Sequence, residues 1–368
     1  RSSAASDVYK RQGEKGLSRL DEIKGSVRFS TDVPTGRVYA KAEATVLDAG
    51  SPSKSGQARF GQNATIEADN IVAQTEAQFD GPGSVNASGV AFSAGYESDF
   101  AQAEVGTTPI GMGKTKVTFR GAVTPEVSPG FRVSAVAERK PVTDSVLSYA
   151  GVVDPVSKER WGQVLRTGFG GGLSYDRDGS GVYGEGRYYR FTGTRVVRND
   201  GFEANVGGYL RAYASPHSSL TVGLNVNYQD YDKSQNYFTW GNGGYFSPQS
   251  FISVGFPVNY TLNNDRFDMR ASFTPGFQSY SQDASPLYPT DAELQGHLDD
   301  AKADDNDVRS YYDESSKTGF ALSALLSLYY KISPTTRIGG ETSYNTFGTY
   351  NEFRSLFSVR QNFGNTGR

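Results

Sequence analysis

The segment from Trp240 to Gln249 combines three aromatic rings with three glycines within ten residues. Aromatic rings offer flat apolar faces that can stack on sugar rings, and tryptophan and tyrosine add a polar edge. Glycine allows backbone conformations that other residues rarely adopt, so a bulky segment of this kind can still fold tightly. We therefore predict a sugar-contacting loop formed by Trp240, Gly241, Asn242, Gly243, Gly244, Tyr245, Phe246, Ser247, Pro248 and Gln249.

Polar, charged and tyrosine side chains recur at every second position in several other stretches. Because both charge signs are present, they create no single-sign field that would concentrate small anions or cations. A neutral, hydrogen-bonding solute fits such a surface better. For any one charged residue the alternative is simple pairing with a neighbour. The residues predicted to face a water-filled lumen and contact a polymer there are Glu185, Arg187, Glu203, Tyr209, Arg211, Tyr213, Asn225, Asn227, Asp268, Arg270, Glu341 and Arg360.

Catalysis by a histidine base would have to use His217 or His297, since the chain has two histidines. His217 lies in the turn Ser215–Ser219 and His297 in an acidic stretch, so neither sits on a strand that could orient it. The sequence also offers no metal-ligand spacing and no phosphate-binding glycine loop. We predict no catalytic residue, metal or cofactor, although paired carboxylates brought together by a fold stay open.

The elements that would position these residues read as amphipathic strands. From Leu220 to Asp230 apolar residues alternate with threonine, glycine, asparagine and glutamine, and Ile252 to Tyr260 repeats the pattern. Successive side chains of a strand point to opposite faces. One face therefore suits lipid and the other suits water, which is typical of a transmembrane antiparallel β-barrel with a wet lumen.

Composition supports this class. Only 36% of the 368 residues are hydrophobic, and no run reaches the roughly 20 apolar residues of a membrane helix. Glycine (43), tyrosine (23) and phenylalanine (22) are abundant, as turns and interfacial aromatic girdles require. The net charge of -3 gives no sign of a nucleic-acid partner.

Alternation and turn residues predict fourteen strands, and two weaker stretches, Ser26–Thr31 and Asn236–Trp240, bring the count to sixteen. Tight turns alternate with long joins, and the tight turns should be periplasmic. We expect a long loop over Ser51–Asn86 and a solvated loop tip at Asp299–Asp307. The fold class is all-β.

We place residues 1–18 outside the barrel, as an artefact or a linker remnant, because Arg1–Gln12 matches no later pattern. Residues 19–368 form the predicted barrel domain. An outer-membrane protein needs a signal peptide, and the chain starts without one, so we expect a piece of a longer precursor.

The stretch Tyr237–Phe251, with its Gly-Gly-Tyr-Phe-Ser-Pro-Gln core, resembles the C-terminal outer-membrane barrel of the cellulose exporters that belong to bacterial cellulose synthase systems. Gly36–Ala40 with Leu47–Gly50, and Gly89–Phe92 with Gly106–Gly111, are similar to earlier segments of that barrel. The resemblance implies a sixteen-stranded barrel in the bacterial outer membrane that exports cellulose, a β-1,4-glucan, to the cell surface. It also implies a preceding periplasmic tetratricopeptide region and an inner-membrane cellulose synthase complex as partners.

Two alternatives stay open, a general diffusion porin and an outer-membrane hydrolase. A porin would share the alternation but would not need a long loop rich in aromatics and glycine. We expect this loop, Asp232–Pro248, to be an extracellular lid over the pore, with Trp240–Gln249 as its gate segment. The alternative is an ordinary loop beside an aromatic girdle.

Overall fold

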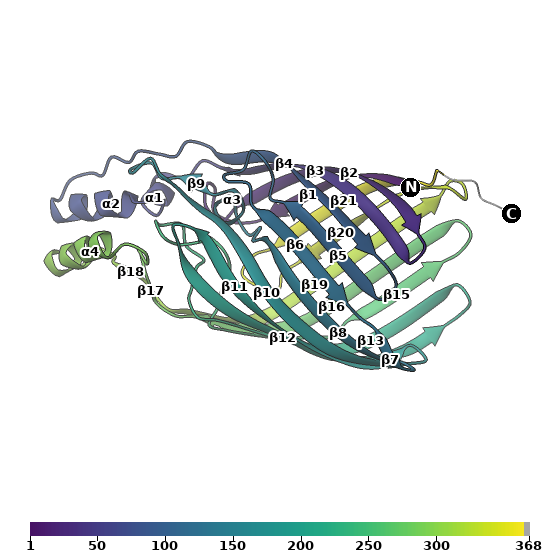
Figure 1. The fold of residues 1–368 in the computed structure, drawn as a ribbon. Coiled ribbons are helices and arrows are strands. Elements are labelled where there is room, and N and C mark those ends of the chain that lie inside the picture. The colour runs from purple at the N-terminus through teal and green to yellow at the C-terminus, as the bar shows by residue number, and fades with distance from the viewer. Residues whose placement is uncertain (364–368) are drawn as a thin grey trace.

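The computed structural model describes residues 1–363 and is a closed antiparallel β-barrel of sixteen strands (Figure 1). Each strand pairs with its neighbours in the chain, and β1 pairs with both β2 and β21, which closes the wall. The strands are β1 (Ser2–Arg11), β2 (Leu20–Val33), β3 (Gly36–Gly50), β4 (Val85–Glu97), β5 (Ala101–Thr107), β6 (Val117–Val123) with β7 (Glu126–Ser128), β8 (Phe131–Pro141), β10 (Arg160–Arg177), β11 (Ser180–Thr194), β12 (Val196–Ala214), β13 (Ser218–Tyr231), β14 (Ser250–Gly255) with β15 (Val258–Asn263), β16 (Phe267–Gln282), β19 (Ser315–Lys331), β20 (Thr336–Asn345) and β21 (Glu352–Gln361).

One wall strand is interrupted where proline stands in it. β14 and β15 both pair with β13 on one side and β16 on the other, with Phe256 and Pro257 between them. Proline has no N–H to give to the ladder. The N–H of Phe256 donates to the carbonyl of Pro275 at 2.9 Å, and the carbonyl of Pro257 accepts from Gly223 at 2.9 Å, so the sheet stays closed across the break.

The predicted alternation is confirmed along β13 and β14. Val222 and Leu224 are exposed on the outer face, while Asn225 donates to Asn205 across the inner face at 2.8 Å. Large apolar side chains exposed around a barrel form the band that lipid covers. The wall therefore has an apolar exterior and a polar interior.

Tight turns join the strands at the end of the barrel where the N-terminus lies (Figure 1). The β10–β11 turn shows the sequence logic, because Asp178 and Gly179 take φ angles of +55° and +77°. A two-residue hairpin turn with both residues at positive φ has a backbone twist that matches the twist of the two strands it joins. Short turns mark the periplasmic side, so the opposite end is extracellular.

The extracellular end carries a cap made by the long joins (Figure 1). It contains α1 (Lys54–Gln57), α2 (Asn63–Val72), α3 (Val146–Ala150), β9 (Val152–Val153), β17 (Ser285–Pro286), α4 (Ala292–Asp304) and β18 (Tyr311–Tyr312). The larger hydrophobic cluster, with Phe60, Trp161 and Trp240, lies largely in these joins rather than within the lumen. Within residues 1–363, none of the helices has the length and apolar character needed to cross a membrane.

Several sequence predictions need correction. Ser26–Thr31 is indeed strand, within β2, but Asn236–Trp240 lies in a loop and the remaining strand is Ser2–Arg11. This segment alternates mainly small and polar residues, so it gave no strong apolar signal. Residues 1–18 thus contribute to the wall, and their origin as an artefact or linker stays a prediction.

Two joins contain helices that the sequence analysis did not expect. The Ser51–Asn86 join holds α1 and α2, and α4 covers the first part of Asp299–Asp307. At the other end of the chain, residues 364–368 of the predicted barrel domain lie outside the described residues.

Candidate functional site

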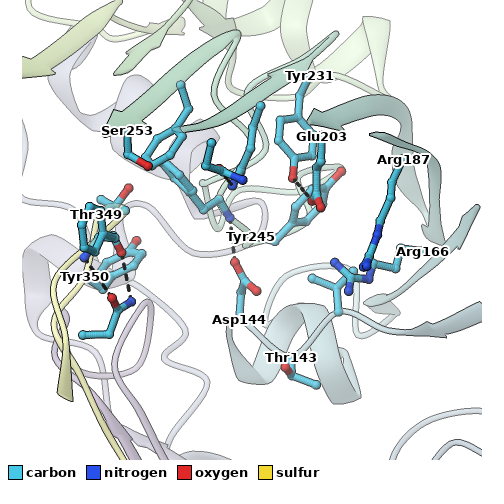
Figure 2. Close-up of a pocket in the computed structure, with 18 of the residues that line it drawn as sticks. Thr143, Asp144, Arg166, Arg187, Glu203, Tyr231, Tyr245, Ser253, Thr349 and Tyr350 are labelled. Carbon is cyan, nitrogen blue, oxygen red and sulfur yellow. Dashed lines mark hydrogen bonds between the residues drawn. The ribbon is translucent and has the colours of Figure 1, made fainter. Parts of the chain in front are cut away.

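A cavity of about 830 Å³ lies in the lumen beneath the extracellular cap (Figure 2). Strands β10 to β14 contribute one side of it, and the joins that carry α3, Trp240–Gln249 and Thr349 contribute much of the rest. Its volume is in the range of small-molecule binding sites, about 300–1,000 Å³. The cavity is therefore large enough to hold a short stretch of a polymer.

The upper boundary of the cavity is aromatic. The ring of Tyr245 stacks on Phe191 with centroids 5.2 Å apart and an angle of 14°. Phe246 meets Phe251 and Tyr280 edge to face, at 6.1 and 5.4 Å. Offset-stacked and edge-to-face arrangements are the favourable ones for aromatic pairs. The loop thus contributes rings that are already well packed to the extracellular side of the cavity.

Hydrogen bonds hold this loop against the α3 join. A carboxylate oxygen of Asp144 accepts from the N–H of Phe246 at 3.0 Å (Figure 2), and Ser145 Oγ donates to the carbonyl of Gly244 at 2.7 Å. Gly244 has φ +65°, and a Cβ there would lie 2.8 Å from Ser145 Oγ. Only glycine fits this position without strain.

Most of the other residues of the loop are buried, and most of them make hydrogen bonds. Trp240 packs on Trp161 at 5.5 Å, and the side-chain amide of Asn242 donates to the carbonyl of Leu287 at 3.0 Å. Ser247 Oγ accepts from the N–H of Gln235 at 2.8 Å. The loop therefore connects the α3 join to the β16–β19 join. The carbonyl of Gly241 accepts from the N–H of Val197, and the carbonyl of Pro248 accepts from the N–H of Tyr231. The side-chain amide of Gln249 donates to the carbonyl of Ser247. Gly243 completes the loop.

Burial stabilises the neutral form of the ring at the centre of the loop. Tyr245 is 1% exposed, and burial raises the pKa of its phenol above the usual range. A tyrosine phenol is already neutral at physiological pH, and this one stays neutral in more alkaline solution. Its oxygen accepts from the side-chain amide of Asn199 at 3.3 Å.

Five of the predicted polymer-contacting residues line the cavity: Glu185, Arg187, Glu203, Asn225 and Asn227. Arg187 pairs with Glu185 at 3.1 Å, and Glu203 accepts from the phenol of Tyr231 at 3.1 Å (Figure 2). Asn225 also donates to the Tyr183 phenol at 2.7 Å. The cavity wall thus combines paired charges with amides.

Other predicted residues lie nearer the periplasmic end. Asp268 accepts from Lys331 and Arg337 at 2.9 and 2.8 Å, and Arg360 lies 4.8 Å from the ring centroid of Tyr329. At the same end, the phenol of Tyr209 donates to Asp176 at 2.6 Å, and Arg211 lies beside Gly179 of the β10–β11 turn. Arg270 lies opposite Thr261 of β15, and Glu341 lies opposite Ser327 of β19. The structure does not bring these residues together with the cavity.

The prediction that Tyr213 faces the lumen is wrong. The register between β12 and β13 shifts between Arg211 and Tyr213, so Ala212 is an extra residue in the strand. Tyr213 then pairs with Leu220 of the outer face and is 53% exposed. A β-bulge changes the face of every residue beyond it, and simple alternation misses this change.

One carboxylate on the inner wall, at a position that alternation points inward, is almost fully buried. Glu138 is 1% exposed and lies 2.8 Å from Arg120, 3.1 Å from Lys140 and 3.4 Å from Arg166. It also accepts from the phenol of Tyr189 at 3.1 Å. A carboxylate this well surrounded is stabilised by charge and hydrogen bonds together. Asp144 was not identified from the sequence, although its neighbour Ser145 begins a capping box that marks α3.

The two histidines lie away from the cavity. The N–H of His217 contacts Ser215 Oγ at 3.4 Å in the β12–β13 turn, and His297 on α4 is 2.6 Å from Asp69 on α2. Within residues 1–363 no cluster of three histidine or acidic side chains could hold a metal ion.

The closed wall, apolar exterior and polar lumen define a transmembrane β-barrel of the bacterial outer membrane. A solved bacterial polysaccharide outer membrane secretin has the same fold, with a TM-score of 0.56 at 8% identity, covering 98% of both chains. Residues 18–364 match the family model for the C-terminus of cellulose synthase operon protein C. The chain belongs to this family.

Named relatives give the same result. The chain is 31% identical to cellulose synthase operon protein C of Pseudomonas fluorescens (strain SBW25) over 360 residues, which are 97% of the chain and 26% of the relative. It is 31% identical to the protein of that name from Xanthomonas axonopodis pv. citri (strain 306), over 95% of the chain and 22% of the relative. The chain thus spans about a quarter of the length of these relatives.

Proposed function

We propose that this barrel is the outer-membrane channel through which cellulose passes from the periplasm to the cell surface. The observation that carries the proposal is the cavity beneath the cap, where stacked aromatic rings face amides and paired charges. Rings can stack on sugar faces, and amides can donate and accept hydrogen bonds with hydroxyls. Membership of the cellulose synthase operon protein C family supports this substrate.

In this function the barrel works without catalysis or a cofactor. A polymer that has to move needs many weak, exchangeable contacts, because a single tight site would hold it in place. Synthesis would belong to an inner-membrane cellulose synthase complex. The greater length of the relatives is consistent with a periplasmic tetratricopeptide region preceding the barrel in the same precursor.

The loop Trp240–Gln249 would act as the gate of this channel. In this proposal it closes the extracellular side of the cavity, and the hydrogen bonds by which Asp144 and Ser145 hold its backbone support a closed resting position. In the open channel the emerging glucan would take the place of the rings of Tyr245 and Phe246. The same loop would then serve as both the seal and the last stacking surface.

A general diffusion porin is the competing function. The experiment is a liposome swelling assay with the purified chain, using arabinose as the small solute and a known porin as the positive control. A gated export channel should leave arabinose excluded, while cellohexaose should bind the detergent-solubilised chain in calorimetry. Rapid arabinose entry together with no cellohexaose binding would identify a porin.

A further inference from the structure

The inner face of the wall is divided into a charged part and an uncharged part. Every inward position of β13, in steps of two from Ser219 to Tyr231, holds a serine, threonine, glycine, asparagine, glutamine or tyrosine. The same holds on β16 from Ser272 to Gln282, and on β19 the inward positions from Gly319 to Tyr329 are uncharged as well. Between them β14 and β15 contribute Phe251, Ser253, Gly255, Asn259 and Thr261.

We call these inward residues of β13, β14, β15, β16 and β19 the uncharged strip. These strands are neighbours in the wall, with β14 and β15 counting as one interrupted strand. β13 pairs with β14 and β15, these pair with β16, and β16 pairs with β19. On β13, β14 and β15 the strip extends from the aromatic cavity, where Tyr231 and Phe251 lie, to the periplasmic turns beyond Ser219 and Thr261. On β16 it ends at Ser272, because the next inward residues toward the periplasm are Arg270 and Asp268. It therefore runs along most of the lumen.

Elsewhere the wall carries ions that satisfy one another. Lys24 pairs with Glu22 at 2.8 Å on β2, and Arg187 with Glu185 at 3.1 Å on β11. On β8 the single carboxylate of Glu138 lies within ion-pair distance of three cations. Much of the hydrogen-bonding capacity of these groups is therefore already used within the ion pairs.

The polar side chains of the strip are uncharged amides and hydroxyls. Gln229 donates to Asn227 Oδ1 at 3.0 Å and Ser272 donates to Asn259 Oδ1 at 2.6 Å. Amides and hydroxyls both donate and accept, as sugar hydroxyls do, so each contact can be exchanged for an equivalent one. Ions bind water more strongly and would have to be desolvated by a passing sugar.

At the extracellular end of the strip, the ring of Phe347 lies over two glycines of the wall. A Cβ at Gly276 would lie 3.0 Å from Cζ of Phe347, and one at Gly255 would lie 4.0 Å from it. The N–H of Gly348 donates to Gln278 Oε1 at 2.7 Å, which anchors the β20–β21 join at this place. Phe347 also borders the cavity. The ring thus stands over the strip rather than over the charged wall.

We propose that the uncharged strip is a track for a linear, neutral, hydroxyl-rich polysaccharide, with Phe347 as its stacking platform near the exit. The proposal rests on the function proposed above and specifies which side of the lumen the polymer follows. The charged wall would fill with water and keep the lumen open. A track on one side lets the chain slide along uniform contacts and stay in line with the cavity.

The test compares the same substitution on the two sides. Ser272→Asp places a carboxylate in the strip beside Asn259 Oδ1, and Ser134→Asp places one among the inward residues of β8. Calorimetry with cellohexaose and the detergent-solubilised chain measures binding, and heat-modifiable gel mobility checks folding. Ser272→Asp should weaken binding about tenfold, or 1.4 kcal/mol, and Ser134→Asp less than about twofold.

A second measurement does not depend on weakening the site. The chain contains no cysteine, so a single cysteine at position 272 or 134 can carry a nitroxide label without interference. Paramagnetic relaxation of the cellohexaose protons should be stronger with the label at 272. Equal relaxation, or equal weakening by the two aspartates, would overturn the track while leaving export in place. A wild-type chain that binds no cellohexaose would instead overturn the proposed function itself.

Discussion

Tyr245→Ala should open the channel if Trp240–Gln249 is the gate. The ring is 1% exposed and is stacked on Phe191 at 5.2 Å, in a cluster with Tyr189 and Tyr231. Truncating a buried aromatic side chain to alanine costs about 3–5 kcal/mol. These contacts belong to the closed arrangement, so most of that cost should fall on the closed state.

At about 1.4 kcal/mol per factor of ten, this loss raises the ratio of open to closed channels by roughly two to three orders of magnitude. Tyr245→Phe keeps the stacked ring and loses only the hydrogen bond from Asn199, worth about 1 kcal/mol. Its effect should be near fivefold. The series Tyr, Phe, Ala should therefore give increasing open probability.

Single-channel recording in planar bilayers measures the open probability directly. Tyr228→Ala is the matched control, because Tyr228 is on the same strand as Tyr231 but on the outer face, with 37% of its surface exposed. Both alanine variants should keep the heat-modifiable mobility of a folded barrel. If Tyr245→Ala and Tyr228→Ala have the same open probability as wild type, the loop is not the gate.

Three further predictions concern the wall and the histidines. Leu224→Arg, an outward position near the middle of β13, should destabilise the barrel in lipid by about 2–4 kcal/mol, measured by guanidinium unfolding in vesicles; an unchanged midpoint would contradict a lipid-facing Leu224. Glu138→Gln should cost about 3–5 kcal/mol in the same assay because three cations lose their carboxylate, whereas Glu185→Gln at a more exposed pair should cost less than about 1 kcal/mol. The purified chain should release no sugar or fatty acid from glycan or lipid; turnover that disappears on replacing His217 or His297 would refute a non-catalytic barrel.

The barrel class followed from the sequence because one physical rule acts on each strand. A wall between lipid and water forces period-two alternation, and β13 shows it in Val222, Leu224, Asn225 and Asn227. The rule is weaker where side chains are small, as in Ser2–Arg11, since alanine and serine are compatible with either face. That strand is specified by its pairing with β2 and with β21, and β21 lies at the far end of the chain.

The candidate site was less predictable, for a similar reason. The aromatic and glycine content of Trp240–Gln249 identified the loop, but its contacts with Asp144, Phe191 and Leu287 depend on how separate joins meet at the cap. The bulge at Ala212 is equally invisible to a period-two rule. Sequence periodicity describes strands, whereas the cavity is made where strands end.

The proposed track, the uncharged strip, ends beside the proposed gate, Trp240–Gln249. Tyr231 ends the inward row of β13 and touches the same cluster as Tyr245, so the uncharged strip leads directly to the base of the closed loop. A sugar arriving along the strip would first meet the rings of Tyr231 and Phe251 and then those of Tyr245 and Phe246. Each new stacking contact would replace a contact that the loop now makes with itself or the wall. If Trp240–Gln249 is the gate, the polymer would supply, step by step, the interactions lost when the loop moves, and the channel would open only where a chain is present to fill it.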